Sequence, residues 1–303
     1  MKNVFTFLLL LFSLLCNGQS PKLFTTDKEL SSSLINQIYQ DRNGFIWIAT
    51  EDGLNRYDGA KFTIYKHEPN NEHSLAHNFV RTVFEDSKGH LLIGTYIGIQ
   101  MYDPATDNFT PLAKLEDTGE TLESNINSFI ERKNGEIWVS GNVLCKLDIK
   151  DHLLTVRKVD IAVTSPGSLF EDKKQNVWMA KGEEGVYQLT PDNQLTLHLS
   201  KDNGYVKSIC EDQRGNIYVG SIRKGLFIYD KERKTFVPID LKEKGELPVC
   251  FLYSGIPNKL YIGTDGKGVV IYNIRTHEIS EYKFDNNYFD SGNSKIHSIL
   301  KDN

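Results

Sequence analysis

The sequence lacks most of the features that would tie a protein to a nucleic acid, a metal or a membrane. It has no basic tract, and its 35 Lys and Arg against 40 Asp and Glu give a formal net charge of −5, which argues against a protein that neutralises phosphates. It has no Cys-X-X-Cys pair, so a zinc or thioredoxin-type site is not expected. No apolar stretch beyond the first 18 residues is long enough to predict a transmembrane helix.

Cysteine and histidine are also sparse. Cys145, Cys210 and Cys250 follow the N-terminal segment, an odd number that cannot all pair internally, and we expect them to be small core residues. The 8 histidines are scattered along the chain rather than grouped. We therefore expect no metal, no cofactor and no catalytic residue in this chain.

The N-terminus resembles an export signal. Lys2 precedes an apolar run over residues 4–15, and small residues follow at the positions that a signal peptidase reads. We predict a signal peptide over residues 1–18, cleaved to leave an exported, periplasmic domain over residues 19–303. A lipid anchor at Cys16 and a retained membrane anchor are the alternatives.

What the sequence has in abundance is internal repetition. One phrase recurs six times, over residues 40–50, 85–95, 131–141, 171–181, 211–221 and 254–264. A large residue marks the same position in each copy: Trp47, Leu92, Trp138, Trp178, Tyr218 and Tyr261. Each unit divides into four short strands separated by Gly, Asp and Asn turns, which predicts a four-stranded antiparallel meander. Repeats of roughly 40–45 residues that each contain four strands are typical of propeller blades.

The repeated residues are interpreted as structural. A small residue two positions after each large one points to the same face of its strand, so the pair is expected to fill the gap between neighbouring blades. The three tryptophans are thus predicted to be core rather than sugar platforms. An aspartate opens the first turn of four units, at Asp41, Asp86, Asp172 and Asp212. Because these copies would lie far apart around a ring, we expect them to accept turn N–H groups rather than act in catalysis or bind calcium.

The sequence predicts an all-β, seven-bladed propeller with six full blades and an incomplete seventh. Six units run from about residue 33 to 285, and residues 295–302 match residues 34–41 position by position. Residues 22–26 resemble the fourth strand of the first unit. We expect these two segments to form the inner and outer strands of blade seven, which closes the ring. On this interpretation the chain is a fragment of a longer protein.

The phrase INQIYQDRNGFIWIATEDGLNRYDGAKFTIYKH at residues 35–67 resembles the two-component regulator propeller repeat, and so does the second unit at residues 80–112. The resemblance implies the periplasmic sensor of a histidine kinase anchored in the inner membrane. Such proteins typically contain a second propeller, a small β-sandwich, a transmembrane helix and a cytoplasmic kinase, and act as homodimers. Many are hybrids that regulate transcription of glycan-utilisation genes in response to oligosaccharides.

This resemblance also implies a ligand site in the cleft between the propeller and its neighbour. We name His77, Asn78, Tyr96 and Arg223 as candidate ligand-binding residues, because a planar aromatic beside polar side chains suits an oligosaccharide. No kinase motif occurs in the chain, and no nucleic-acid contact is expected of it. The alternatives are a secreted propeller enzyme of the lyase or glycosidase type and a secreted binding scaffold.

Overall fold

The computed structural model describes residues 23–26, 29–199, 204–241, 247–282 and 295–301. The predicted signal peptide lies outside these residues. All regular elements in the described part of the chain are strands, which confirms the all-β prediction. No helix suited to crossing a membrane occurs among the described residues.

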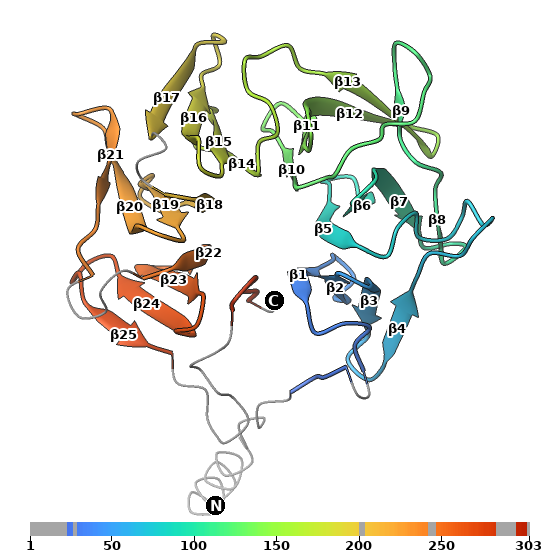
Figure 1. Cartoon of the computed structure of the whole chain (residues 1–303), viewed down its shortest axis with the longest axis horizontal. Coiled ribbons are helices and arrows are strands. Elements are labelled where there is room, and N and C mark those ends of the chain that lie inside the picture. The colour runs from blue at the N-terminus through green and yellow to red at the C-terminus, as the bar shows by residue number, and fades with distance from the viewer. Residues whose placement is uncertain (1–22, 27–28, 200–203, 242–246, 283–294, 302–303) are drawn as a thin grey trace, which may run out of the picture.

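The strands form six sheets around a central axis, as Figure 1 shows. Blade 1 contains β1 (Ile35–Gln40), β2 (Ile46–Thr50), β3 (Gly53–Tyr57) and β4 (Phe62–Tyr65). Blade 2 contains β5 (Val80–Glu85), β6 (Leu91–Thr95), β7 (Ile99–Asp103) and β8 (Asn108–Phe109). Blade 3 contains β10 (Ser128–Glu131), β11 (Ile137–Ser140), β12 (Leu144–Lys150) and β13 (Leu153–Lys158), with β9 (Lys114–Leu115) added in parallel to its outer strand.

The remaining three blades repeat the same order. Blade 4 contains β14 (Ser168–Glu171), β15 (Val177–Lys181), β16 (Gly185–Leu189) and β17 (Leu195–Leu199). Blade 5 contains β18 (Val206–Glu211), β19 (Ile217–Ser221), β20 (Gly225–Asp230) and β21 (Thr235–Pro238). Blade 6 contains β22 (Val249–Ile256), β23 (Lys259–Thr264), β24 (Val269–Asn273) and β25 (Ile279–Glu281). Six four-stranded antiparallel meanders are therefore present, as predicted, and the first strand of each lies nearest the axis (Figure 1).

The turn aspartates stabilise the turn between the first and second strands of their blades. In blade 1, Asp41 Oδ1 accepts the backbone N–H groups of Asn43 at 2.9 Å and Phe45 at 3.0 Å, and its Oδ2 accepts the indole N–H of Trp47 at 2.7 Å. Gly44 completes this turn with a φ of 87°, which an L side chain rarely adopts. The two backbone bonds recur at the other three aspartates, Asp86, Asp172 and Asp212. The indole bond recurs at Asp172, from Trp178, whereas Asp212 accepts the hydroxyl of Tyr218. Their structural interpretation is confirmed.

Blade 3 has Arg132 at the position of the turn aspartate. The Arg132 guanidinium lies over the ring of Trp138, and its Nε is 3.0 Å from Glu171 of blade 4. The indole N–H of Trp138 donates instead to Glu136. Burial alone would raise the pKa of Glu136, but hydrogen bonds from Lys146 and its other partners lower that pKa to about 2.

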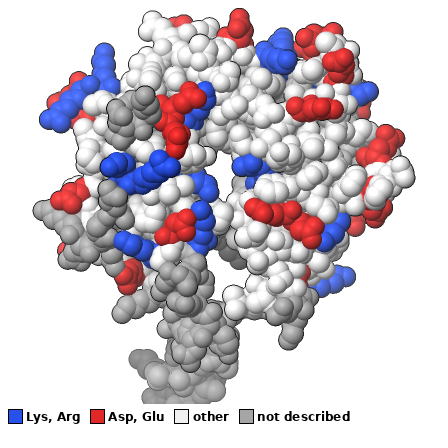
Figure 2. Space-filling view, viewed as in Figure 1, with Lys and Arg blue, Asp and Glu red and all other residues white. Residues whose placement is uncertain are grey.

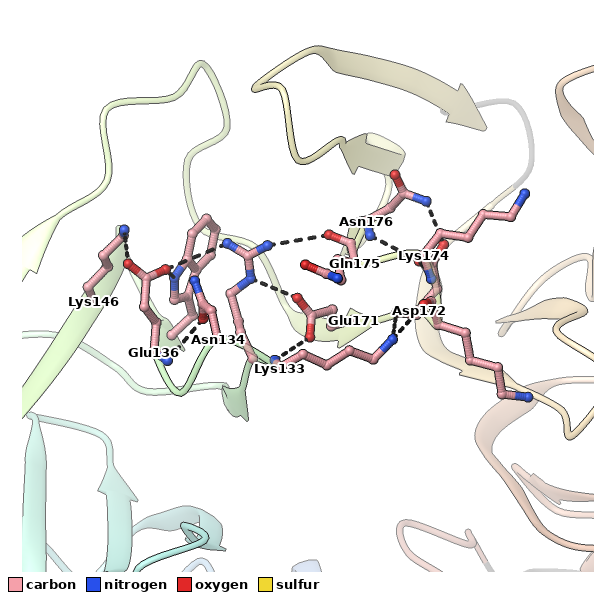
Figure 3. Close-up of polar contacts among 12 residues, drawn as sticks. Lys133, Asn134, Glu136, Lys146, Glu171, Asp172, Lys174, Gln175 and Asn176 are labelled. Carbon is pink, nitrogen blue, oxygen red and sulfur yellow. Dashed lines mark hydrogen bonds and ion pairs between the residues drawn. The ribbon is translucent and has the colours of Figure 1, made fainter.

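A glutamate at the end of the inner strand joins neighbouring blades, a contact that the sequence analysis did not predict. Glu171 accepts the backbone N–H of Lys133 at 2.7 Å, across the gap between blades 3 and 4 (Figure 3). Equivalent bonds run to Glu85 from Arg42 and to Glu131 from Ser87. An acidic side chain therefore sets the height of one blade against the next at these three junctions.

Apolar packing between blades follows the predicted pairing of large and small residues. Trp47, Trp178 and Tyr218 are fully buried. A Cβ on Gly220 would lie 2.4 Å from the side chain of Val249 in the next blade, so only glycine fits there without a shift. Cys145, Cys210 and Cys250 are buried and free, as predicted, and burial raises the pKa of the Cys210 thiol to about 12.

Residues 295–301 lie between blade 6 and blade 1. The N–H of Ile296 donates to the carbonyl of Thr264 at 2.9 Å, and its side chain covers Gly263 of blade 6. Ser298 Oγ accepts the N–H of Ile38 in blade 1 at 3.2 Å. The described residues contain six complete blades, and a seventh is not shown among them.

Candidate functional site

The inner strands enclose an axial cavity of about 530 Å³. Each of the six blades contributes the residue that follows the first apolar position of its inner segment: Asn36, Arg81, Asn127, Gly167, Lys207 and Cys250. His297, from the segment beside blade 1, occupies the equivalent position and also lines the cavity. The cavity is thus built from sequence-distant residues that the ring brings to one axis.

Basic side chains dominate the charge of this cavity. Arg81, Lys181 and Lys207 line it, and among the described residues no carboxylate does. Figure 2 shows Lys and Arg side chains on both sides of the central opening. Lys181 is paired with Glu184 at 2.7 Å, whereas Lys207 forms no ion pair with any residue that the structure describes. The cavity therefore favours a negatively charged or strongly polar occupant.

Two groups in the cavity titrate away from their usual ranges. Burial lowers the pKa of Lys207, and the charges of Lys295 and Arg81 act in the same direction, although Cys250 and Asp265 oppose them. Burial also lowers the pKa of His297, again reinforced by Lys207 and Lys295. Burial is the largest cause of both shifts, and the opposing charge of Asp265 does not cancel it.

The predicted residues His77 and Tyr96 lie together, His77 on the link between blades 1 and 2 and Tyr96 in the turn between β6 and β7 of blade 2. Their ring centroids are 5.6 Å apart, and the Phe79 ring lies 6.0 Å from that of Tyr96. The Arg81 guanidinium lies 5.7 Å from the centre of the Phe79 ring. Tyr96 is 53% exposed. Since Arg81 also lines the cavity, this aromatic cluster is continuous with the axial site.

Asn78 has a local structural role that the sequence analysis missed. Its side-chain oxygen accepts the N–H of His67 at 2.8 Å, and its amide donates to Asp52 at 3.0 Å. Its backbone carbonyl accepts the N–H of Gly53 at 2.7 Å. These bonds hold the link between blades 1 and 2 in place and use the polar atoms that a ligand would need.

Arg223 lies away from the other three, in the turn between β19 and β20 of blade 5. Its guanidinium is 3.1 Å from Glu183 of blade 4, and both side chains are well exposed. It packs beside Gly204, next to Tyr205, and Tyr205 lines the axial cavity. The structure therefore groups His77 with Tyr96 and places Arg223 at the junction of blades 4 and 5.

Sequence reasoning missed Arg81, Lys207 and Tyr205. The first two were detectable in principle, because each directly follows an apolar position of its inner strand and so points to the other face of that strand. Which of the two faces meets the axis is decided only by how the blades stack.

Another hollow, of about 660 Å³, lies beside the link between blades 2 and 3 and is lined by residues from Leu115 to Lys158. It draws on one stretch of chain, whereas the axial cavity receives side chains from every blade. In the described ranges, no three His, Cys, Asp or Glu side chains gather in a way that could hold a metal ion. The axial cavity and its aromatic rim are therefore the candidate site.

Comparison with solved structures places the fold among known propellers. The extracellular domain of a putative hybrid two-component system from B. thetaiotaomicron is 21% identical, with a TM-score of 0.78 over 93% of this chain and 39% of that domain. A second such domain from the same organism is 17% identical with a TM-score of 0.74. Virginiamycin B lyase from Staphylococcus aureus, in a catalytically inactive form, is 13% identical with a TM-score of 0.66 over 88% of both chains. At these identities the likeness shows the fold alone.

Sequence comparison is more specific. A histidine kinase of Formosa agariphila, named P4, is 37% identical over 83 residues, which is 25% of this chain and 6% of the kinase. The chain thus matches only a small part of that relative's length. The family described as two-component regulator propeller matches residues 29–52, 74–96 and 200–223. These segments fall in the first, second and fifth units of the repeat, so the chain carries the repeat of the two-component regulator propeller family, as its sequence predicted.

Proposed function

We propose that this chain is the ligand-sensing propeller of a membrane-bound histidine kinase, exported to the periplasm by residues 1–18. The observation that carries the proposal is the match of three units to the two-component regulator propeller repeat. The likeness in fold to extracellular domains of two-component systems supports the same location. The chain would bind a ligand, and the kinase chemistry would belong to other parts of the sensor.

The ligand is an oligosaccharide in this proposal. Tyr96 offers an exposed ring beside His77, and Arg81 provides a planar polar group between that ring cluster and the axial cavity. Binding would favour one arrangement of a homodimeric sensor over another, and the population shift would change kinase activity. A second propeller and a β-sandwich would complete the site, and the output would be transcription of glycan-utilisation genes, by a hybrid sensor.

We also propose that the ring has seven blade positions. Ser298 accepts an N–H from blade 1 as Gln37 accepts that of Val83 in blade 2, at 2.7 Å. Phe24 packs on Tyr57 and Phe62 of blade 1 at ring distances of 5.0 Å. Tyr65 of blade 1 makes the same kind of contact with blade 2. These equivalent contacts support residues 295–301 as an inner strand and residues 23–26 as an outer edge of the seventh position.

A secreted lyase or glycosidase is the alternative function from the sequence, but we do not propose it. Its structural support is the likeness to virginiamycin B lyase, which at 13% identity concerns the fold. Histidine and carboxylate do meet at His90 and Asp86, at 2.7 Å, but this pair belongs to the turn of blade 2. Its carboxylate already accepts two turn N–H groups.

Replacing Tyr96 with alanine tests the site. We expect oligosaccharide affinity to fall about tenfold, because the variant removes an exposed aromatic anchor. The measurement is isothermal titration calorimetry of the periplasmic region with an oligosaccharide panel. Tyr282→Ala is the matched control, since Tyr282 is similarly exposed, at 47%, but follows β25 at the edge of blade 6. Absence of binding by any oligosaccharide to folded protein would contradict the proposed ligand class.

A further inference from the structure

We propose that the axial cavity binds an oxyanion group of the ligand, a carboxylate or a sulfate, between Arg81 and Lys207. This inference rests on the proposed sensing function and names the chemical class of its ligand. An uncharged oligosaccharide could use the aromatic rim alone. An acidic or sulfated one would also extend its negative group into the cavity.

The first support is the convergence of positive charge. Arg81 lies on β5 of blade 2 and Lys207 on β18 of blade 5, yet both line the same cavity and each is half-buried. Their charges are close enough for Arg81 to lower the pKa of Lys207, after the larger effect of burial. Holding two like charges in a partly dehydrated space is unfavourable unless an anion offsets them.

The second support is that the neighbouring cations already have acidic partners, whereas Arg81 and Lys207 keep N–H groups that a ligand could use. Lys295 is 2.8 Å from Asp265, and Lys181 is paired with Glu184. Arg81 donates one hydrogen bond to Asn125 at 3.3 Å, which leaves other guanidinium N–H groups for a ligand. Charge-assisted bonds from a guanidinium and an ammonium are the donors that carboxylate and sulfate groups take most readily.

The test is calorimetric titration of the periplasmic region with sodium sulfate and, separately, with glucuronate and glucose, at constant ionic strength. We expect sulfate and glucuronate to bind and glucose to bind more weakly. Lys207→Met should weaken sulfate binding at least about tenfold, which corresponds to about 1.4 kcal/mol. Arg81→Met should act in the same direction.

Lys61→Met is the control, because it removes the same charge from an exposed position on the outer side of blade 1. Equal sulfate affinity in Lys207→Met and Lys61→Met, with both variants folded, would overturn the inference. Binding of neutral oligosaccharides only, unchanged by Lys207→Met, would overturn it while leaving the sensing function intact. Sulfate binding with no oligosaccharide binding would instead contradict the proposed oligosaccharide ligand and keep the anion site.

Discussion

Replacing Trp178 with alanine is expected to destabilise the propeller by about 3–5 kcal/mol, the usual cost of removing a large aromatic side chain from a core. Trp178 is 1% exposed and lies between blades 4 and 5, where its ring meets Tyr229 at 5.0 Å and Phe236 at 5.7 Å. The loss therefore affects the junction as well as one sheet. The measurement is urea denaturation followed by circular dichroism.

Trp178→Phe is the matched control. It keeps most of the apolar contact and removes the indole N–H that donates to Asp172 at 2.9 Å. Its cost should be clearly smaller than that of the alanine variant, because less cavity is created. If the alanine variant were as stable as the wild type, the interpretation of the large repeated residue as inter-blade core would be wrong.

Replacing Asp172 with alanine should cost about 2–4 kcal/mol, since a buried donor left without its acceptor loses about 1–3 kcal/mol. The carboxylate accepts the backbone N–H groups of Lys174 and Asn176, the side-chain amide of Asn176 and the indole N–H of Trp178. All of these donors lose their partner at once. The free energy of unfolding, measured by the same denaturation, checks this.

Asp58→Ala provides the comparison for that variant. Asp58 accepts the N–H groups of Ala60 and Lys61 in the same manner, at 2.8 Å each, but is exposed to solvent. Water can replace its bonds, so the loss of stability is expected to be clearly smaller than that of Asp172→Ala. Similar costs for the two aspartates would show that burial does not set the importance of the repeated turn residue.

The blades themselves were predictable from the sequence because their determinants are local. Asp41, Gly44 and Trp47 lie within one turn and one strand, so their spacing already indicates the hydrogen bonds that the structure contains. The small residue at Gly220 was predictable for the same reason, although its partner Val249 in the next blade was not identified. Local repetition thus predicts each blade and the existence of a neighbour.

The site was less predictable because it depends on how the blades stack. Arg81 and Lys207 are far apart in the chain and meet only at the axis. The inter-blade bond from Lys133 to Glu171 likewise requires the height of one blade relative to the next. Asn78 looked available for a ligand in the sequence, but its side chain is committed to His67 and Asp52. Polar character alone does not distinguish a residue that lines the cavity, such as Arg81, from one whose side chain is used in local hydrogen bonds, such as Asn78.

The central claim is that this propeller selects the signal to which a sensor kinase responds. The most direct measurement exchanges residues 19–303 of the proposed sensor for the corresponding propeller of another sensor and records induced transcription across a panel of oligosaccharides. The account predicts that the inducer spectrum follows the exchanged propeller. An inducer spectrum that stays with the rest of the sensor, with the hybrid protein folded and able to signal, would contradict it.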